Sequence, residues 1–144
     1  MFTPRYATED DLELTISIEK ETINKTQEPS NKIYISLTNI GDEKIRVFHD
    51  FSIEQLLAYH IITPSNITIY ANLYEVQHEY RYITLSPSEK LETTIDIFDY
   101  NYVIDYENEY NWNETGLFKI QFSYLNEPNL ETIESNVIEF WYEE

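Results

Sequence analysis

The chain has no cysteine and only two glycines among its 144 residues. Without cysteine there are no disulfides, no catalytic thiols, no zinc–thiolate sites and no iron–sulfur clusters. The two glycines, Gly41 and Gly116, are too few to build the glycine-rich loops that hold phosphate groups. The remaining candidate chemistry therefore depends on carboxylates, hydroxyls, amides and three histidines.

Positive charge is also scarce. Nine Lys and Arg stand against 27 Asp and Glu, which gives a formal net charge of −18. Such a surface repels phosphate backbones and anionic lipid, so we expect neither nucleic-acid binding nor attachment to an anionic membrane. The same charge favours cations or a basic partner, although it also serves solubility alone.

A long hydrophobic run is the third absence. No stretch approaches the roughly 18 consecutive apolar residues of a membrane-spanning helix, so membrane insertion is not expected. Residues 1–13 lack the apolar core of a signal peptide, and the compartment stays open between the cytoplasm and an extracytoplasmic chain without its leader. Hydrophobic residues still make up 42% of the chain. We therefore expect a flexible N-terminal tail over residues 1–10 and one domain over residues 11–144.

Apolar and polar residues alternate with a period of two, which predicts strands. The alternation covers residues 11–20, 31–39, 66–74, 80–98, 117–125 and 136–144. Its inward-facing members are predicted to be Leu12, Leu14, Ile16, Ile18, Ile33, Ile35, Leu37, Leu91, Thr93, Ile95, Ile97, Phe118, Ile120, Phe122 and Tyr124. The pattern predicts an all-β fold, an antiparallel sandwich of seven to eight strands.

Three shorter signals refine this prediction. Gly41-Asp42 between apolar runs predicts a tight hairpin with positive φ at the glycine. Residues 86–89 predict a turn before the next strand. Residues 52–59 have the only helical pattern, at most two turns long.

No catalytic constellation stands out. The histidines are His49, His60 and His78, and no pair has the spacing that places two metal ligands on one helix or strand face. With 27 acids a pair of catalytic carboxylates can always be nominated, so the nomination carries no weight. We expect that the protein is not an enzyme.

The most unusual stretch is residues 99–112, which combines carboxylates, asparagines and large aromatics without a positive charge. Calcium takes six to eight oxygen ligands, and candidate ligands here are Asp96, Asp99, Asn101, Asp105 and Glu107, although the spacing is not that of an EF-hand. The candidate partner-binding aromatics are Tyr100, Tyr102, Tyr106, Tyr110 and Trp112. The alternative interpretation is structural, because tyrosine is a good strand residue and residues 97–115 can simply connect one sheet to the other.

Four segments carry a family resemblance: "SLTNIGDEKIRV", "ITLSPSEKLETTIDI", "ETGLFKIQFSY" and "ESNVIEFWY". Together they resemble the immunoglobulin-like β-sandwich domains of prokaryotic proteins, which include, in a broad sense, the intracellular proteinase inhibitors of bacilli and accessory domains of secreted metallopeptidases. The resemblance implies a sandwich fold and no shared set of binding residues. The turn at Ser86-Pro87-Ser88-Glu89 lacks the glycine of those domains, so a different turn type is expected there.

These observations predict a non-catalytic module that binds a protein partner or has an accessory or structural role. Two alternatives stay open. One is a proteinase inhibitor that presents residues 61–66 or 125–135 to a protease cleft. The other is a surface domain stabilised by calcium. No cofactor other than calcium is expected, and the oligomeric state is not determined by the sequence.

Overall fold

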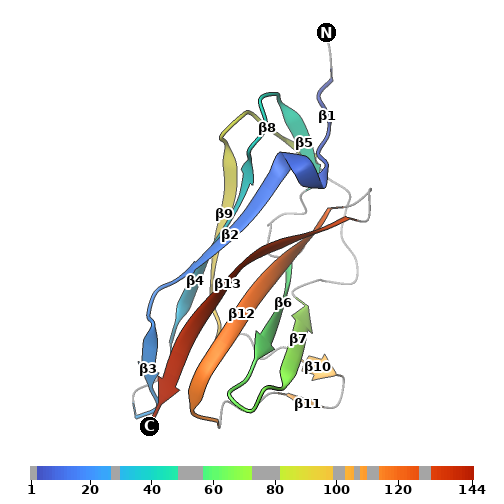
Figure 1. Ribbon diagram of the computed structural model, residues 1–144. Coiled ribbons are helices and arrows are strands. Elements are labelled where there is room, and N and C mark those ends of the chain that lie inside the picture. The colour runs from blue at the N-terminus through green and yellow to red at the C-terminus, as the bar shows by residue number, and fades with distance from the viewer. Residues whose placement is uncertain are drawn as a thin grey trace.

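The computed structural model describes residues 3–26, 30–48, 57–72, 82–98, 103–105, 108–109, 114–126 and 131–144. These residues form strands and one short 3₁₀ helix, η1, with no α-helix among them, which confirms the all-β prediction (Figure 1). The elements are β1 (Arg5–Tyr6), η1 (Glu9–Asp11), β2 (Leu12–Ile18), β3 (Thr22–Asn24), β4 (Lys32–Asn39), β5 (Ile45–Phe48), β6 (Leu57–Ile62), β7 (Thr68–Asn72), β8 (Tyr82–Leu85), β9 (Lys90–Asp96), β10 (Val103–Asp105), β11 (Asn108–Glu109), β12 (Gly116–Asn126) and β13 (Glu131–Glu143).

The strands form two principal sheets and two small ones. One principal sheet has the order β2-β4-β9, and the other has the order β3-β13-β12-β6-β7. A third sheet, β1-β5-β8, lies at the N-terminal end of the molecule, and β10 pairs with β11 (Figure 1). No helix in the described part of the chain is long and apolar enough to cross a bilayer.

The principal sheets share one hydrophobic core, which the period-two alternation predicted correctly. On β12, Phe118, Ile120, Phe122 and Tyr124 are fully buried, and the residues between them are exposed or half-buried. The buried faces of β2, β4 and β9 supply the opposite wall of the core, from Leu12, Leu14, Ile16, Ile33, Ile35, Leu37 and Ile95. Leucine and isoleucine on one wall thus meet aromatic rings, together with further leucine and isoleucine, on the other.

The all-β fold is divided into more strands and sheets than predicted. The described residues form thirteen strands rather than seven to eight. Four of them have only two or three residues and are too short to show alternation, and the other nine still exceed the prediction. Two pairings are parallel, β1 with β5 and β3 with β13, so the sheets are not purely antiparallel.

The hairpin predicted at Gly41 is wrong. β4 pairs with β2 and β9, whereas β5 pairs with β1 and β8, so residues 40–44 connect two different sheets. Gly41 does not have the positive φ of a tight hairpin. The buried Asn39 shapes this connection instead: its amide nitrogen donates to the carbonyl oxygens of Glu43 and Leu85, both at 3.0 Å, and its side-chain oxygen accepts the Gly41 N–H at 2.9 Å. A side-chain turn of this kind needs no left-handed residue.

The turn at residues 86–89 is present, closed by the Glu89 N–H donating to the Ser86 carbonyl oxygen at 3.0 Å. Ser88 takes a φ of +70°, the left-handed conformation that the missing glycine would adopt. Proline followed by a residue with positive φ is the pattern of a type II turn. The expectation of a different turn type is therefore wrong, because serine occupies the glycine conformation.

The helical pattern at residues 52–59 is also misleading. Leu57, Ala58 and Tyr59 belong to strand β6, which pairs with β12, while residues 52–56 lie outside the described residues. Pairing and burial in the sheet outweigh a local helical preference of one or two turns.

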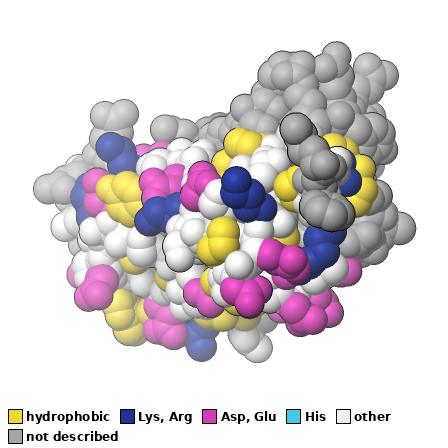
Figure 2. Space-filling view, turned by 90° about the horizontal axis from the view of Figure 1, so that it is seen from above, with side chains coloured by type: hydrophobic (Ala, Val, Ile, Leu, Met, Phe, Trp, Pro, Cys, Tyr) yellow, Lys and Arg dark blue, Asp and Glu magenta, His cyan; other side chains and the backbone are white. Residues whose placement is uncertain are grey.

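Residues 3–11 carry β1 and η1, although the sequence predicts a flexible tail over residues 1–10. Arg5 binds both carboxylate oxygens of Asp11 at 2.6 and 2.8 Å and donates to Glu43 at 2.7 Å. Ala7 is buried, and its carbonyl oxygen accepts from the side chain of Asn126 at 3.0 Å. Figure 2 looks onto this end of the molecule, where acidic and basic side chains are interspersed.

Candidate functional site

The outer face of the five-stranded sheet is the surface with the strongest indication of function. Its side chains point away from the core, opposite to the buried ones on the same strands. The register of β7, β6, β12 and β13 aligns Tyr70, His60, Gln121 and Val137 in one row across the face. The next row contains Thr68, Ile62, Lys119 and Glu139. Trp141 stands opposite Leu117 in the row after that.

Large apolar side chains are exposed on this face. Tyr70 is 65% exposed, Val137 53% and Trp141 49%. These three side chains are not part of the hydrophobic core, which is formed by residues on the opposite face of the same strands. Exposed aromatic and aliphatic groups gathered on one face are typical of binding surfaces.

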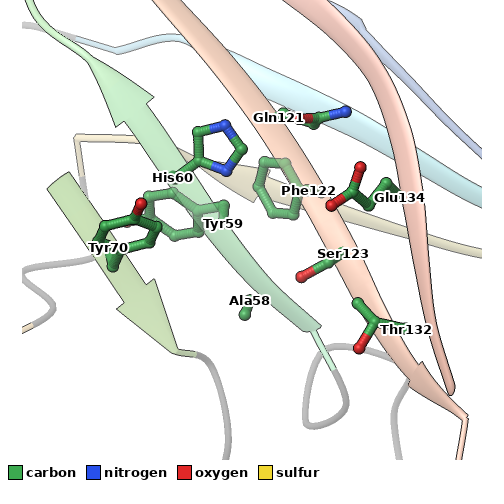
Figure 3. Close-up of a pocket in the computed structure, with 9 residues that line it drawn as sticks. All are labelled: Ala58, Tyr59, His60, Tyr70, Gln121, Phe122, Ser123, Thr132 and Glu134. Carbon is green, nitrogen blue, oxygen red and sulfur yellow. The ribbon is translucent and has the colours of Figure 1, made fainter. Parts of the chain in front are cut away.

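A hollow of about 190 Å³ opens on the face. It lies over Ala58 and Ser123, two small outward side chains on neighbouring strands. Tyr70 and His60 form one wall with ring centroids 6.0 Å apart, while Gln121 and Glu134 come from the strands on the other side (Figure 3). The other lining residues are Tyr59, Phe122 and Thr132.

The far wall of the hollow is built on a β-bulge. The register of β12 against β13 shifts between Gln121 and Ser123. The buried Ser135 fills the irregularity: its hydroxyl accepts the Phe122 N–H at 2.9 Å and donates to the Asn136 carbonyl oxygen at 2.7 Å. The Gln121 amide nitrogen donates to the Ser135 carbonyl oxygen at 2.7 Å, which fixes the orientation of the Gln121 side chain beside the hollow. Bulges often re-aim side chains in this way.

The hollow also has a firm floor. The rings of Tyr59 and Phe122 pack in the core directly beneath it, with centroids 5.0 Å apart. Next to the bulge, Asn136 holds the two principal sheets together, because its side chain accepts the Ile16 N–H at 2.8 Å and donates to the Ile16 carbonyl oxygen at 2.9 Å. The wall and the floor are therefore fixed by hydrogen bonds and ring packing.

Of the candidate calcium ligands, the structure describes the side chain of Asp96 alone. Its Oδ1 accepts the N–H groups of Asn31 and Phe98 at 3.0 and 3.1 Å, and its Oδ2 accepts the hydroxyl of Ser30 at 2.5 Å. Partial burial acts to raise the pKa of Asp96, but these hydrogen bonds outweigh it and hold the pKa below its ordinary value. Asp96 therefore closes the end of β9 against residues 30–31.

The side chains of the other predicted site residues are not among those that the structure describes. Asp105 lies on β10, of which only the backbone is described. The rest, outside the described residues, are Asp99, Asn101, Glu107, Tyr100, Tyr102, Tyr106, Tyr110 and Trp112. The connection that carries them leaves β9 in one sheet and enters β12 in the other, and β10 lies beside β7, the edge strand of the outer face (Figure 1).

The metal prediction thus stays a prediction. Within the described ranges, no group of three or more His, Cys, Asp or Glu side chains is placed to hold a metal ion. His60 lines the hollow, and His49 and His78 are outside the described residues.

Sequence reasoning missed the outer face because it followed the inward residues of each strand. A signal was nevertheless present. Val137 and Trp141 occupy positions that the alternation assigns to solvent, and Tyr70 does the same on β7. Apolar residues on both faces of one strand were the sequence feature that could have indicated an exposed apolar surface.

No protein-family model matches the chain, and no curated protein matches it by sequence. The alkylpurine DNA glycosylase AlkC of Pseudomonas fluorescens, solved with DNA containing an abasic site analogue, aligns with 93% of this chain at 9% identity and a TM-score of 0.50. The sporulation control protein Spo0M of Bacillus subtilis covers 93% at 9% identity (TM-score 0.48), and a β-glucosidase from Listeria innocua in complex with glucose covers 92% at 13% identity (TM-score 0.48). The chain spans 31%, 50% and 16% of those proteins, and the likeness to AlkC concerns the fold alone.

Proposed function

We propose that the chain is a non-catalytic protein-binding module of the immunoglobulin-like type, and that it contacts its partner through the outer face of the five-stranded sheet. The observation that carries the proposal is the exposure of Tyr70, Val137 and Trp141 on one side of that sheet. A partner that covers them removes apolar surface from water, which is the main favourable term in association.

Strand order supports the immunoglobulin-like part of the proposal. The order β13-β12-β6-β7 matches the G-F-C-C′ sheet of variable-type immunoglobulin domains, and β2-β4-β9 matches the A-B-E strands of the facing sheet. The fit is partial, because β5 and β8 join β1 in a separate sheet instead of extending the A-B-E sheet.

Residue types support the binding part. Tryptophan and tyrosine dominate the energetics of many interfaces, because each supplies a large apolar surface with few rotatable bonds. Trp141 and Tyr70 stand on strands of one rigid sheet, so ordering them on binding costs little entropy. The polar groups beside them, His60, Gln121 and Lys119, give such an interface directional contacts.

The test compares two exposed aromatics on opposite sheets. Tagged protein with Trp141→Ala or Val137→Asp is used for affinity capture from the source cells, beside wild type and the control Tyr34→Ala. Tyr34 is 43% exposed on β4 of the other sheet. We expect proteins captured by wild type to be retained by Tyr34→Ala and lost at least tenfold by the two outer-face variants, as for interface anchors. Equal capture by all four proteins would overturn the proposal.

The inhibitor alternative is less well supported. In the turn between β6 and β7, the Thr63 N–H donates to the Ile67 carbonyl oxygen and the Asn66 N–H to the Thr63 carbonyl oxygen, at 2.9 and 2.8 Å. The N–H groups of Thr63 and Asn66 are already used within the turn, so they are not available to donate to a protease. Within residues 125–135, the described positions belong to β12 and β13. Assays against serine, cysteine and metalloproteases test this alternative, and inhibition of any one class would favour it.

A further inference from the structure

We propose that the hollow on the outer face receives an arginine side chain from a basic segment of the partner. This inference rests on the proposed function and adds the chemistry of the partner. It follows from the shape of the hollow, from its charge and from the groups that line it.

Shape favours a single inserted side chain. The hollow of about 190 Å³ is small for a drug-sized ligand, for which pockets of about 300 Å³ or more are usual. The hollow exists because Ala58 and Ser123 are small and lie opposite each other on β6 and β12. The larger side chains of Tyr70 on β7 and Glu134 on β13 flank them (Figure 3). Hollows of this kind accept one anchor residue of a partner.

Charge selects a cation. Glu134 is the one carboxylate among the described residues that line the hollow, and it is exposed on β13. Lys119 lies on the next row of the face and does not line the hollow. The net charge of −18 adds a long-range field that draws positively charged groups toward the protein. A basic partner is therefore favoured over an acidic or a neutral one.

The lining groups favour arginine over lysine. A guanidinium is planar, stacks on aromatic faces and carries five N–H donors, whereas an ammonium acts as a compact point charge. Tyr70 is 65% exposed and its ring stands beside that of His60, so an aromatic surface is accessible for stacking. Acceptors come from the Glu134 carboxylate, the hydroxyls of Ser123 and Thr132, and the Gln121 amide oxygen, whose orientation the bond to Ser135 fixes.

The experiment uses the full chain and three short peptides. Acetyl-Gly-Arg-Gly-amide is titrated into the ¹⁵N-labelled protein at about 0.15 M salt, where Debye screening within about 8 Å weakens non-specific attraction by the net charge. The citrulline peptide has the same shape without the charge, and the lysine peptide has the charge without the plane. We expect saturable amide shifts in residues 58–60, 70, 121–123 and 132–134 with the arginine peptide, with a Kd on the order of millimolar. The citrulline peptide should bind at least tenfold more weakly, and the lysine peptide about threefold more weakly.

Two pairs of variants locate the effect. Glu134→Gln should weaken the arginine peptide about fivefold, the upper range for an exposed ion pair. Its control is Glu139→Gln, which removes the same charge from the same strand and face outside the hollow and should leave the Kd unchanged. Ala58→Leu fills the hollow and should abolish the shifts, whereas Thr68→Leu enlarges a side chain on the same face outside it and should not. The amide spectrum of each free variant verifies that it is folded.

Equal binding of the arginine and citrulline peptides, equal effects of Glu134→Gln and Glu139→Gln, or shifts spread over the whole acidic surface would each overturn the inference. The result for the arginine peptide and the result for partner capture can be told apart. If Trp141→Ala and Val137→Asp abolish partner capture and the arginine peptide does not bind, the outer face is a binding surface and the arginine assignment is wrong.

Discussion

The two principal sheets have similar inner faces and different outer faces. Inside, both present alternating apolar side chains to one core. Outside, the three-stranded sheet presents mainly Thr, Ser, Glu and Lys, with Tyr34 as its large apolar residue among those described. The outer face of the five-stranded sheet presents Tyr70 in the wall of a hollow, and Val137 and Trp141 outside that hollow. Folding explains the inner faces, so the outer difference requires another cause, and we assign it to binding.

The largest expected effect separates inner from outer faces. Phe118 is fully buried on β12, and Phe118→Ala should lower the free energy of unfolding by about 3–5 kcal/mol. Trp141→Ala, on the outer face of the same sheet, should lower it by less than about 1 kcal/mol. Urea denaturation measures both. If the two variants are equally destabilised, Trp141 supports the fold and the contrast between the faces is lost.

Acid should weaken the fold through Asp11, which lies on neither outer face. Hydrogen bonding from Arg5, together with the Thr8 N–H and hydroxyl, outweighs burial and lowers the pKa of Asp11 from 3.8 to about 2. A lowered folded-state pKa contributes stability above the unfolded pKa, and that contribution is lost as the pH falls from about 4 to 2. Because Arg5 is 45% exposed, solvent limits the contribution to about 1–2 kcal/mol.

Urea denaturation at several pH values checks this. Asp11→Asn should lower the free energy of unfolding at pH 6 and flatten its fall between about pH 4 and pH 2. Asp10→Asn is the control, because Asp10 is an exposed neighbour in the same η1 turn. Identical pH profiles for the two variants would contradict the role of the Arg5–Asp11 pair.

A smaller change should stabilise the protein without touching either outer face. Ser88→Gly relieves the positive φ at the turn between β8 and β9 and should raise the free energy of unfolding by about 1 kcal/mol. Ser65→Gly is the matched control: Ser65 does not have positive φ, and its hydroxyl lies 3.0 Å from that of Thr63. The control should lower stability. A loss of stability in Ser88→Gly would show that the serine side chain matters more than the backbone conformation.

The smallest expected effect concerns calcium. The oxygens of Asp96 already accept protein donors, so we expect calcium chloride and EDTA to give melting temperatures within about 1 °C of each other. Thermal denaturation in each buffer measures this. A rise of several degrees with calcium would favour the metal site predicted in the connection between β9 and β12, and with it a role for that connection beside the outer face.

Sequence patterns predicted the core well and the connections poorly. Period-two alternation identified the buried residues of β2, β4 and β12, because one-sided burial in a sheet imposes that period directly. The connection at Gly41 was mistaken for a hairpin, because its conformation depends on Asn39 bonding to Leu85, 46 residues away. Long-range hydrogen bonds of this kind leave no local pattern.

The candidate site was mostly beyond the reach of the sequence. The hollow needs Ala58, Ser123 and Glu134 to meet across three strands, and the register of Glu134 against Ser123 depends on a bulge at Ser135 that no turn residue marks. The exposed apolar residues Tyr70, Val137 and Trp141 were the part of the site visible in the sequence, as exceptions to the alternation. The proposed preference for a basic partner has a basis in the sequence as well, because net charge depends on composition alone.

The most direct test of the binding surface is site-specific photo-cross-linking. A photoreactive phenylalanine analogue replaces Trp141 on the outer face of the five-stranded sheet or, in a second protein, Tyr34 on the other sheet, and both proteins are illuminated in the source cells. The two positions are similarly exposed, at 49% and 43%. We predict that a discrete protein adduct forms from position 141 and not from position 34. Adducts of equal yield from both positions, or from position 34 alone, would contradict the assignment of the binding surface to the five-stranded sheet.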